Sequence, residues 1–213
     1  MDRPANGRVE RGFVPLELAQ FRVEPIGDGS AEAGARIVGY VAVYNQWSPV
    51  YFGSYRERIA PGFFDPALGQ DVRALFNHDA NFVLGRTRSQ TLALASDEVG
   101  LRATIEVGSA RTIQDLVVEP MRRGDVTGAS FSFNLPQEGG SAWNQGADGI
   151  MERTLVRCET LWDVGPVTFP FYPQTELALR SLESWVRENV APPAEFSRSN
   201  RERRAALSAA LHS

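Results

Sequence analysis

Residues 128–134 read Gly-Ala-Ser-Phe-Ser-Phe-Asn, and this alternation of small or polar and aromatic side chains is typical of a β-strand. Because successive side chains of a strand point to opposite faces, Ser130 and Ser132 share one face with Asn134. The two phenylalanines share the other face, where they can anchor the strand in a hydrophobic core. The stretch therefore predicts a strand that presents serine hydroxyls to a cleft.

Two other stretches contain side chains that could activate such a hydroxyl. His78 lies in the run Leu-Phe-Asn-His-Asp, and the only other histidine is His212. Asp163 lies within the largely apolar residues 161–170. A serine hydroxyl is a poor nucleophile until an imidazole accepts its proton, and an acid that fixes the tautomer of the imidazole improves this base. We therefore interpret His78, Ser130 and Asp163 as a candidate group for acyl transfer.

The residues alone leave two assignments open. Ser132 shares a strand face with Ser130, so either hydroxyl could reach His78. Glu159 competes with Asp163 as the acid, and a water molecule could also take that position.

Arg86 and Arg153 are further candidates for the site. Each guanidinium could hold an oxyanion-binding water or an acidic group of a substrate. The alternative for each is a structural ion pair on the surface.

Composition bounds the architecture. The chain has 213 residues, of which 43% are hydrophobic and 23% are charged, enough to bury one sizeable core. We expect one catalytic domain over residues 13–190, between a flexible tail at 1–12 and a linker with an arginine-rich tail at 191–213. The net charge of -4 argues against general nucleic-acid binding. Cys158 is the only cysteine, so no disulfide can form within the chain, and we expect it to be a small buried residue.

No stretch approaches the roughly 18 apolar residues of a membrane span. Residues 1–12 are polar and lack the apolar core of a signal peptide. We therefore expect a cytoplasmic protein with no membrane partner. Neither a cluster with metal-ligand spacing nor a phosphate-binding glycine loop occurs, so we expect no metal and no cofactor.

Hydrophobic patterns along the chain predict an α+β fold that is rich in strands. The apolar spacing predicts a helix over 110–123, which Gly124 ends and Pro120 bends or shortens. A second helix is expected over 175–189, and the glycine-rich residues 136–149 are expected to form a loop. The expected strands are 16–25 and 35–44 as a pair, 71–76 with His78 just beyond its end, 91–95 and 101–107 as a hairpin, and one or two strands within 151–169.

Six stretches, in this order, resemble the HK97-type family of tailed-phage prohead proteases between about residues 37 and 173. They are Gly-Tyr-Val-Ala-Val-Tyr-Asn at 39–45, Ile-Ala-Pro-Gly-Phe-Phe at 59–64, Val-Arg-Ala-Leu-Phe-Asn-His-Asp at 72–79, Leu-Gly-Arg-Thr at 84–87, residues 123–133, and Asp-Val-Gly-Pro-Val-Thr-Phe-Pro at 163–170. Any one of these matches is weak evidence, whereas six in order are strong evidence.

The resemblance implies a serine endopeptidase that cleaves segments of scaffold and major capsid proteins. It would act inside the immature prohead, in the cytoplasm of the bacterial host. The implied fold has a β-rich, barrel-like sheet core with a few surrounding helices, similar to the herpesvirus maturation protease. A homodimer is left open. The alternative is a non-catalytic capsid-assembly or scaffold-binding protein on the same fold.

The resemblance also implies roles for individual residues. His78 falls on the base of the family and Ser130 on its nucleophile. Herpesvirus relatives have a second histidine as the third residue, whereas the phage pattern has an acid, which matches Asp163. Ser132 stands where glycine is common, so a structural or substrate-contacting role is expected for it.

Overall fold

The computed structural model describes residues 9–27, 34–51, 53–126 and 128–169, all within the compact unit Met1–Gln174. The predicted helix over 175–189, the boundary at residue 190 and the arginine-rich tail lie outside the described residues. The described chain is rich in strands and contains few helices, which agrees with the predicted α+β class.

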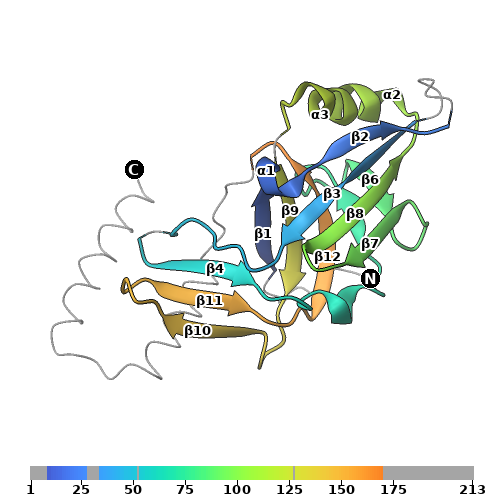
Figure 1. Ribbon diagram of the computed structural model, residues 1–213. Coiled ribbons are helices and arrows are strands. Elements are labelled where there is room, and N and C mark those ends of the chain that lie inside the picture. The colour runs from blue at the N-terminus through green and yellow to red at the C-terminus, as the bar shows by residue number, and fades with distance from the viewer. Residues whose placement is uncertain (1–8, 28–33, 52, 127, 170–213) are drawn as a thin grey trace, which may run out of the picture. The chain divides into compact units, whose positions relative to one another are not determined.

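Three sheets make up the described fold (Figure 1). The largest has the strand order β1-β9-β12-β5-β6. Its strands are β1 (Glu10–Pro15), β9 (Gly128–Asn134), β12 (Thr160–Val167), β5 (Arg73–Leu75) and β6 (Val83–Arg86). All its neighbours pair antiparallel except β12 and β5, which are parallel. The predicted strand at 128–134 is therefore confirmed, and every residue of β9 is buried because strands flank it on both sides.

The second sheet has the order β2-β3-β8-β7, and the third has the order β10-β11-β4. The strands of the second are β2 (Arg22–Pro25), β3 (Ala35–Val43), β8 (Gly100–Val107) and β7 (Leu92–Ser96). Those of the third are β10 (Ser141–Gln145), β11 (Met151–Leu155) and β4 (Tyr55–Ile59). The predicted pairing of the first two strands and the predicted hairpin are confirmed as β2 with β3 and β7 with β8.

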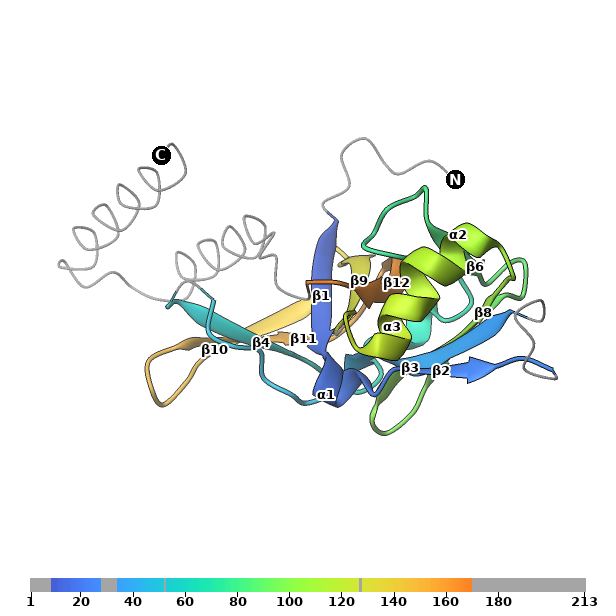
Figure 2. The same ribbon diagram turned by 90° about the horizontal axis from the view of Figure 1, so that it is seen from above.

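The predicted helix over 110–123 forms in three consecutive pieces. These are α2 (Arg111–Ile113), the π-helical turn η2 (Gln114–Val118) and α3 (Glu119–Arg123). Pro120 lacks a backbone N–H and its ring crowds the preceding turn, and the wider π turn directly before α3 accommodates both effects. Gly124 ends the helix with a φ of 81°, as predicted. Figures 1 and 2 show β4, β10 and β11 together on one side of β9, with α2 and α3 toward the other.

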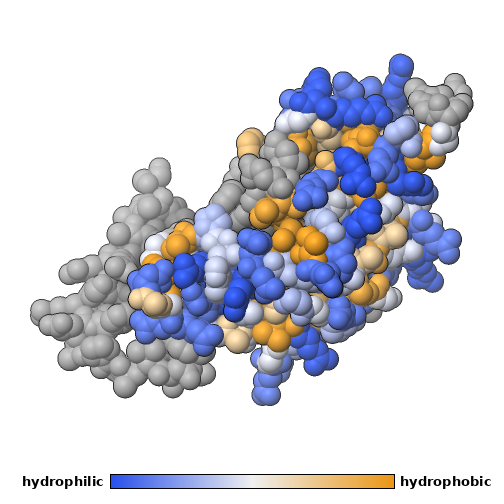
Figure 3. All heavy atoms as spheres, in the orientation of Figure 1, coloured by the Kyte–Doolittle hydropathy of each residue, from blue (hydrophilic) through white to orange (hydrophobic). Residues whose placement is uncertain are grey.

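An aromatic cluster forms the centre of the core. Phe131 and Phe133 of β9 pack edge-on against Phe64 and Phe63, with ring centroids 5.1 and 5.4 Å apart. Phe63 and Phe64 precede the short 3-10 helix η1 (Asp65–Ala67) and also pack edge-on against each other. Edge-to-face pairs are favoured by the ring quadrupole, so they fix β9 firmly. On the face seen in Figure 3, apolar groups form several small patches separated by polar side chains.

Three expectations from the sequence were wrong. The predicted strand 16–25 contains a short helix, α1 (Leu16–Ala19), before β2 begins at Arg22. The expected tail at residues 1–12 overlaps β1, which begins at Glu10. The expected loop 136–149 contains β10. Strand pairing is the reason for the last two differences, because β1 is paired with the distant β9 and β10 forms a hairpin with the next strand, β11.

The expected barrel-like closure is not seen in the described residues. Their strands divide among three sheets, and the largest of these has β1 and β6 as its edges.

Candidate active site

Strands β9 and β12 and the end of β5 bring the three candidate residues together. In the antiparallel register of β9 and β12, Ser132 pairs with Asp163 and Ser130 pairs with Gly165. β5 runs parallel to β12, with Arg73 opposite Asp163, and its chain continues into the turn that contains His78. Residues from three distant segments therefore meet at the three central strands of the five-stranded sheet.

The imidazole of His78 connects the other two side chains. Its Nε2 lies 2.7 Å from Oγ of Ser130, and its Nδ1 contacts Oδ1 of Asp163 in a short hydrogen bond. When Nδ1–H donates to the carboxylate, Nε2 is left as the acceptor for the serine hydroxyl. Ser130 and Asp163 are only 5% and 1% exposed. Such a geometry can draw a proton from Ser130 and hold the resulting imidazolium.

Ser132 is fully buried and also contacts the imidazole, but at the other nitrogen. Its Oγ lies 3.1 Å from Nδ1 of His78, where Asp163 is also bound. The expectation that either serine could reach the histidine is confirmed. Only Ser130 contacts Nε2, however, so the geometry separates the two hydroxyls.

Strand β1 contacts the Ser130 hydroxyl from its other side. Oγ of Ser130 lies 2.8 Å from the carbonyl oxygen of Gly12 and can donate a hydrogen bond to it. A hydroxyl has one proton, so this carbonyl and Nε2 of His78 are alternative acceptors. A Cβ at Gly12 would lie 2.1 Å from the ring of Phe131, so only glycine lets β1 approach β9 this closely.

Gly165 permits a second close approach. A Cβ on this residue would lie 2.0 Å from the carbonyl oxygen of Leu75, in β5. Because β5 leads to His78 and β12 carries Asp163, the missing side chain brings the imidazole and the carboxylate within reach of each other. This role of Gly165 was not predicted from the sequence.

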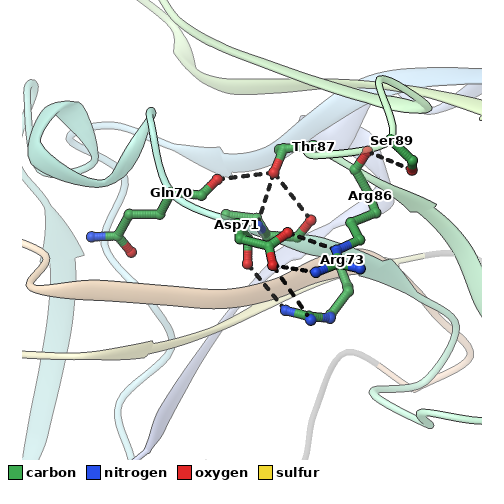
Figure 4. A network of polar contacts seen from close by, with 7 residues as sticks. Gln70, Asp71, Arg73, Arg86, Thr87 and Ser89 are labelled. Carbon is green, nitrogen blue, oxygen red and sulfur yellow. Dashed lines mark hydrogen bonds and ion pairs between the residues drawn. The ribbon is translucent and has the colours of Figure 1, made fainter. Parts of the chain in front are cut away.

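A polar network joins the beginning of β5 to β6 (Figure 4). Asp71 accepts two hydrogen bonds from Arg86, at 2.7 and 2.5 Å, and lies 3.5 Å from Arg73. The Arg86 guanidinium lowers the pKa of the Asp71 carboxyl to about 2. Thr87 donates to the carbonyl oxygen of Gln70. Arg86 was expected either to hold a water or a substrate group, or to form a structural ion pair. The contact with Asp71 matches the ion pair.

Gln70 extends this network to β12. Its side-chain amide donates to the carbonyl oxygen of Glu159 and accepts from the backbone N–H of Leu161, at 2.8 and 3.0 Å. The segment before β5 is thereby attached to the beginning of the strand that carries Asp163. Sequence reasoning missed Gln70, because no local pattern marks a glutamine that bridges two distant strands.

Arg153 is 2% exposed and is held by two carboxylates. It donates to both oxygens of Glu10 at 2.6 and 3.0 Å and to Glu57 at 3.3 Å. The ion pairs connect β1 to β11 and β4. Burial raises the pKa of the Glu57 carboxyl, although Arg153 opposes that shift. This ion pair is structural, but it is buried, whereas the sequence suggested the surface.

The competing acid lies elsewhere. Glu159 is exposed in the bend before β12, and its backbone N–H donates to the carbonyl oxygen of Asn134. The preceding Cys158 is fully buried, as expected, and burial raises the pKa of its thiol to about 12.

The described residues also bear on metal sites and on membrane-spanning helices. In the described part of the chain, no three His, Cys, Asp or Glu side chains form a group that could hold a metal ion. No helix among the described residues has the length and apolar character needed to cross a membrane.

Comparison with known proteins gives one match. A family model described as caudovirus prohead serine protease matches residues 23–188, which is more than half of the chain. No curated protein and no solved structure matches. The expected similarity to the herpesvirus maturation protease therefore stays a prediction.

Proposed function

The chain belongs to the caudovirus prohead serine protease family, and we propose that it is a serine endopeptidase with Ser130 as the nucleophile, His78 as the general base and Asp163 as the orienting acid. One observation carries this proposal: the two nitrogens of a single imidazole contact the Ser130 hydroxyl and the Asp163 carboxylate. The same arrangement performs acyl transfer on several unrelated folds.

The proposed reaction has two halves. Oγ of Ser130 first attacks the carbonyl carbon of the scissile peptide, and Nε2 of His78 takes the hydroxyl proton. The C–N bond breaks, the amine leaves with that proton, and an acyl ester remains on Ser130. Water then attacks the ester and gives a proton to His78, which returns it to Oγ as the ester bond breaks. Asp163 keeps the ring oriented and stabilises its positive charge throughout.

We propose segments of the scaffold and major capsid proteins as the substrates, cleaved inside the immature prohead. The description of the family supports this class of substrate, because a prohead is an assembly of such proteins.

The test is to co-express the protein with the scaffold and capsid proteins of the same phage and to measure fragment masses. Wild-type protein and a Ser89→Ala control, altered at an exposed serine, should produce the same fragments. Ser130→Ala should produce none. Wild-type protein that binds scaffold but neither cleaves it nor reacts with a fluorophosphonate would contradict the proposal and favour the non-catalytic assembly role.

A further inference from the structure

The turn that contains His78 has an unusual backbone. Asn77 and His78 are consecutive residues with φ angles of 53° and 59°, in the left-handed region. Residues with a Cβ rarely adopt this conformation, although asparagine tolerates it better than most. Such a conformation persists where surrounding contacts fix it, and it is concentrated at functional sites. The contacts that hold this turn therefore bear on the position of the imidazole.

Asn77 makes three hydrogen bonds to the last residues of β12 and to Thr168, which follows that strand. Its backbone N–H donates to the carbonyl oxygen of Pro166 at 3.1 Å. Its side-chain Oδ1 accepts from the backbone N–H of Thr168 at 2.9 Å, and its Nδ2 donates to Oγ1 of Thr168 at 3.2 Å. All three partners lie within five residues after Asp163 on the same segment.

Backbone pairing between β5 and β12 stops before the turn. The register has only two residue pairs, Arg73 with Asp163 and Ala74 with Val164. Backbone hydrogen bonds from Phe76 to Phe82 and from Asn77 to Pro166 hold the extension between Ala74 and His78. The side chain of Asn77 adds two hydrogen bonds to Thr168, directly after β12 and directly next to His78.

We infer that Asn77 is a positioning residue of the proposed reaction. Its side-chain amide binds the His78 turn to Thr168 through two hydrogen bonds. These bonds hold the imidazole so that Nδ1 contacts Asp163 and Nε2 contacts the Ser130 hydroxyl. The inference rests on the proposed function. Asn77 acts through His78 and has no contact with the reacting atoms in this role.

Substitutions at Asn77 and Thr168 remove different parts of the contact between these two residues. Asn77→Gly removes both side-chain hydrogen bonds but suits the left-handed backbone. Asn77→Asp keeps an oxygen for the Thr168 N–H, and Thr168→Val removes only the hydroxyl partner of Nδ2. Asn81→Gly is the matched control, because Asn81 lies in the same loop and its side chain contacts Asp79 rather than β12.

The experiment measures how fast a fluorophosphonate probe reacts with Ser130, and also what fraction of the protein finally reacts. Asn77→Gly should slow the reaction by about tenfold to a hundredfold, the effect of misplacing a catalytic group by a fraction of an ångström to 1 Å, while the final fraction stays at the wild-type level. Asn77→Asp should recover much of that rate. In an otherwise wild-type protein, Thr168→Val should lower the labelling rate a few-fold. In the Asn77→Gly background it should not lower that rate further. A purely structural role would lower the fraction that reacts and leave the rate of that fraction unchanged.

The outcomes separate the two proposals. Wild-type protein that shows no Ser130-dependent labelling overturns the proposed function and, with it, the role of Asn77. Ser130-dependent labelling with wild-type rates in both Asn77→Gly and Thr168→Val overturns only the positioning role. If Asn77→Gly does not fold, the labelling rate of Thr168→Val tests the positioning role, because this variant leaves Asn77 intact.

Discussion

Oγ of Ser132 lies 3.1 Å from Nδ1 of His78, so the two serines on one face of β9 contact opposite nitrogens of the same imidazole. Nδ1 is also bound by Asp163. Because the nitrogen that accepts the nucleophile's proton must be free of the carboxylate, Ser132 can support the orientation of the ring but is poorly placed to be activated by it.

We therefore expect unequal effects from replacing the two serines. Ser130→Ala should lower peptide hydrolysis by about six orders of magnitude, the usual result of removing a serine nucleophile. Ser132→Ala should lower it by less than about tenfold, because Asp163 still orients the ring through Nδ1. Initial rates of cleavage of the proposed capsid-protein substrates measure both effects. An inactive Ser132→Ala beside an active Ser130→Ala would reverse the assignment.

Replacement of Gly165 should separate β5 from β12. In Gly165→Ala, the new Cβ would lie 2.0 Å from the carbonyl oxygen of Leu75, so the strands must move apart. Overpacking of this kind costs about 1–3 kcal/mol, and in a chain of this size each kcal/mol lowers the melting temperature by roughly 2–4 °C. We expect the rate of peptide hydrolysis to fall even at temperatures where Gly165→Ala stays folded, because the same movement takes His78 away from Asp163.

Gly108→Ala is the matched control for this experiment. Apart from the two chain neighbours of Gly108, no atom of the described residues lies within 4 Å of a Cβ built on it, so the melting temperature and activity of Gly108→Ala should stay near those of the wild type. Equal behaviour of the two alanine variants would show that β5 and β12 tolerate a wider separation than we infer.

Glu57 should make stability depend on pH. Burial raises the pKa of its carboxyl above the ordinary value of 4.5, so the folded state keeps the proton at pH values where the unfolded state has released it. Stability from this group is therefore fully present below about pH 4.5 and is lost as the pH rises through the folded pKa. Glu57→Gln has no carboxyl at this position and does not lose stability in this way. The difference obtained by subtracting the wild-type melting temperature from that of Glu57→Gln should therefore increase with pH.

Thermal melts between pH 4.5 and 8 check this expectation. Glu98→Gln, at an exposed glutamate, is the control and should follow the wild type at every pH. A melting-temperature difference for Glu57→Gln that shrinks as the pH rises would contradict the sign of the shift.

Several strands could be predicted because their sequence signals are local. The alternation at 128–134 and the hairpin of β7 and β8 depend on side chains that follow one another in the chain. The same patterns predicted that a short strand ends near His78, as β5 does. The three candidate residues, singled out by their chemistry and by resemblance to a family, lie together in the structure.

Other features could not be predicted because they depend on distant partners. β10 lies in a glycine-rich segment with no clear strand pattern. Its hairpin with β11 is local, but its Trp143 packs edge-on against Tyr55 of the distant strand β4. The first residue of β1, Glu10, is fixed by Arg153 from β11, so a polar end of the chain becomes part of a sheet. The bridges made by Gln70 and Asn77 likewise join segments about 90 residues apart.

Cys158 should be unreactive in the folded protein. Its side chain is fully buried, and burial raises the pKa of its thiol to about 12, so very little thiolate exists near pH 8. An unfolded cysteine has a pKa near 8.5, which gives roughly a thousandfold more thiolate at that pH. Iodoacetamide should therefore label the native protein at least a thousandfold more slowly than the protein in guanidinium chloride, as followed by intact mass. Rapid labelling of the native protein, without loss of its melting transition, would mean that the segment between β11 and β12 opens readily, and the attachment of β12 by Gln70 would then be weaker than its two hydrogen bonds suggest.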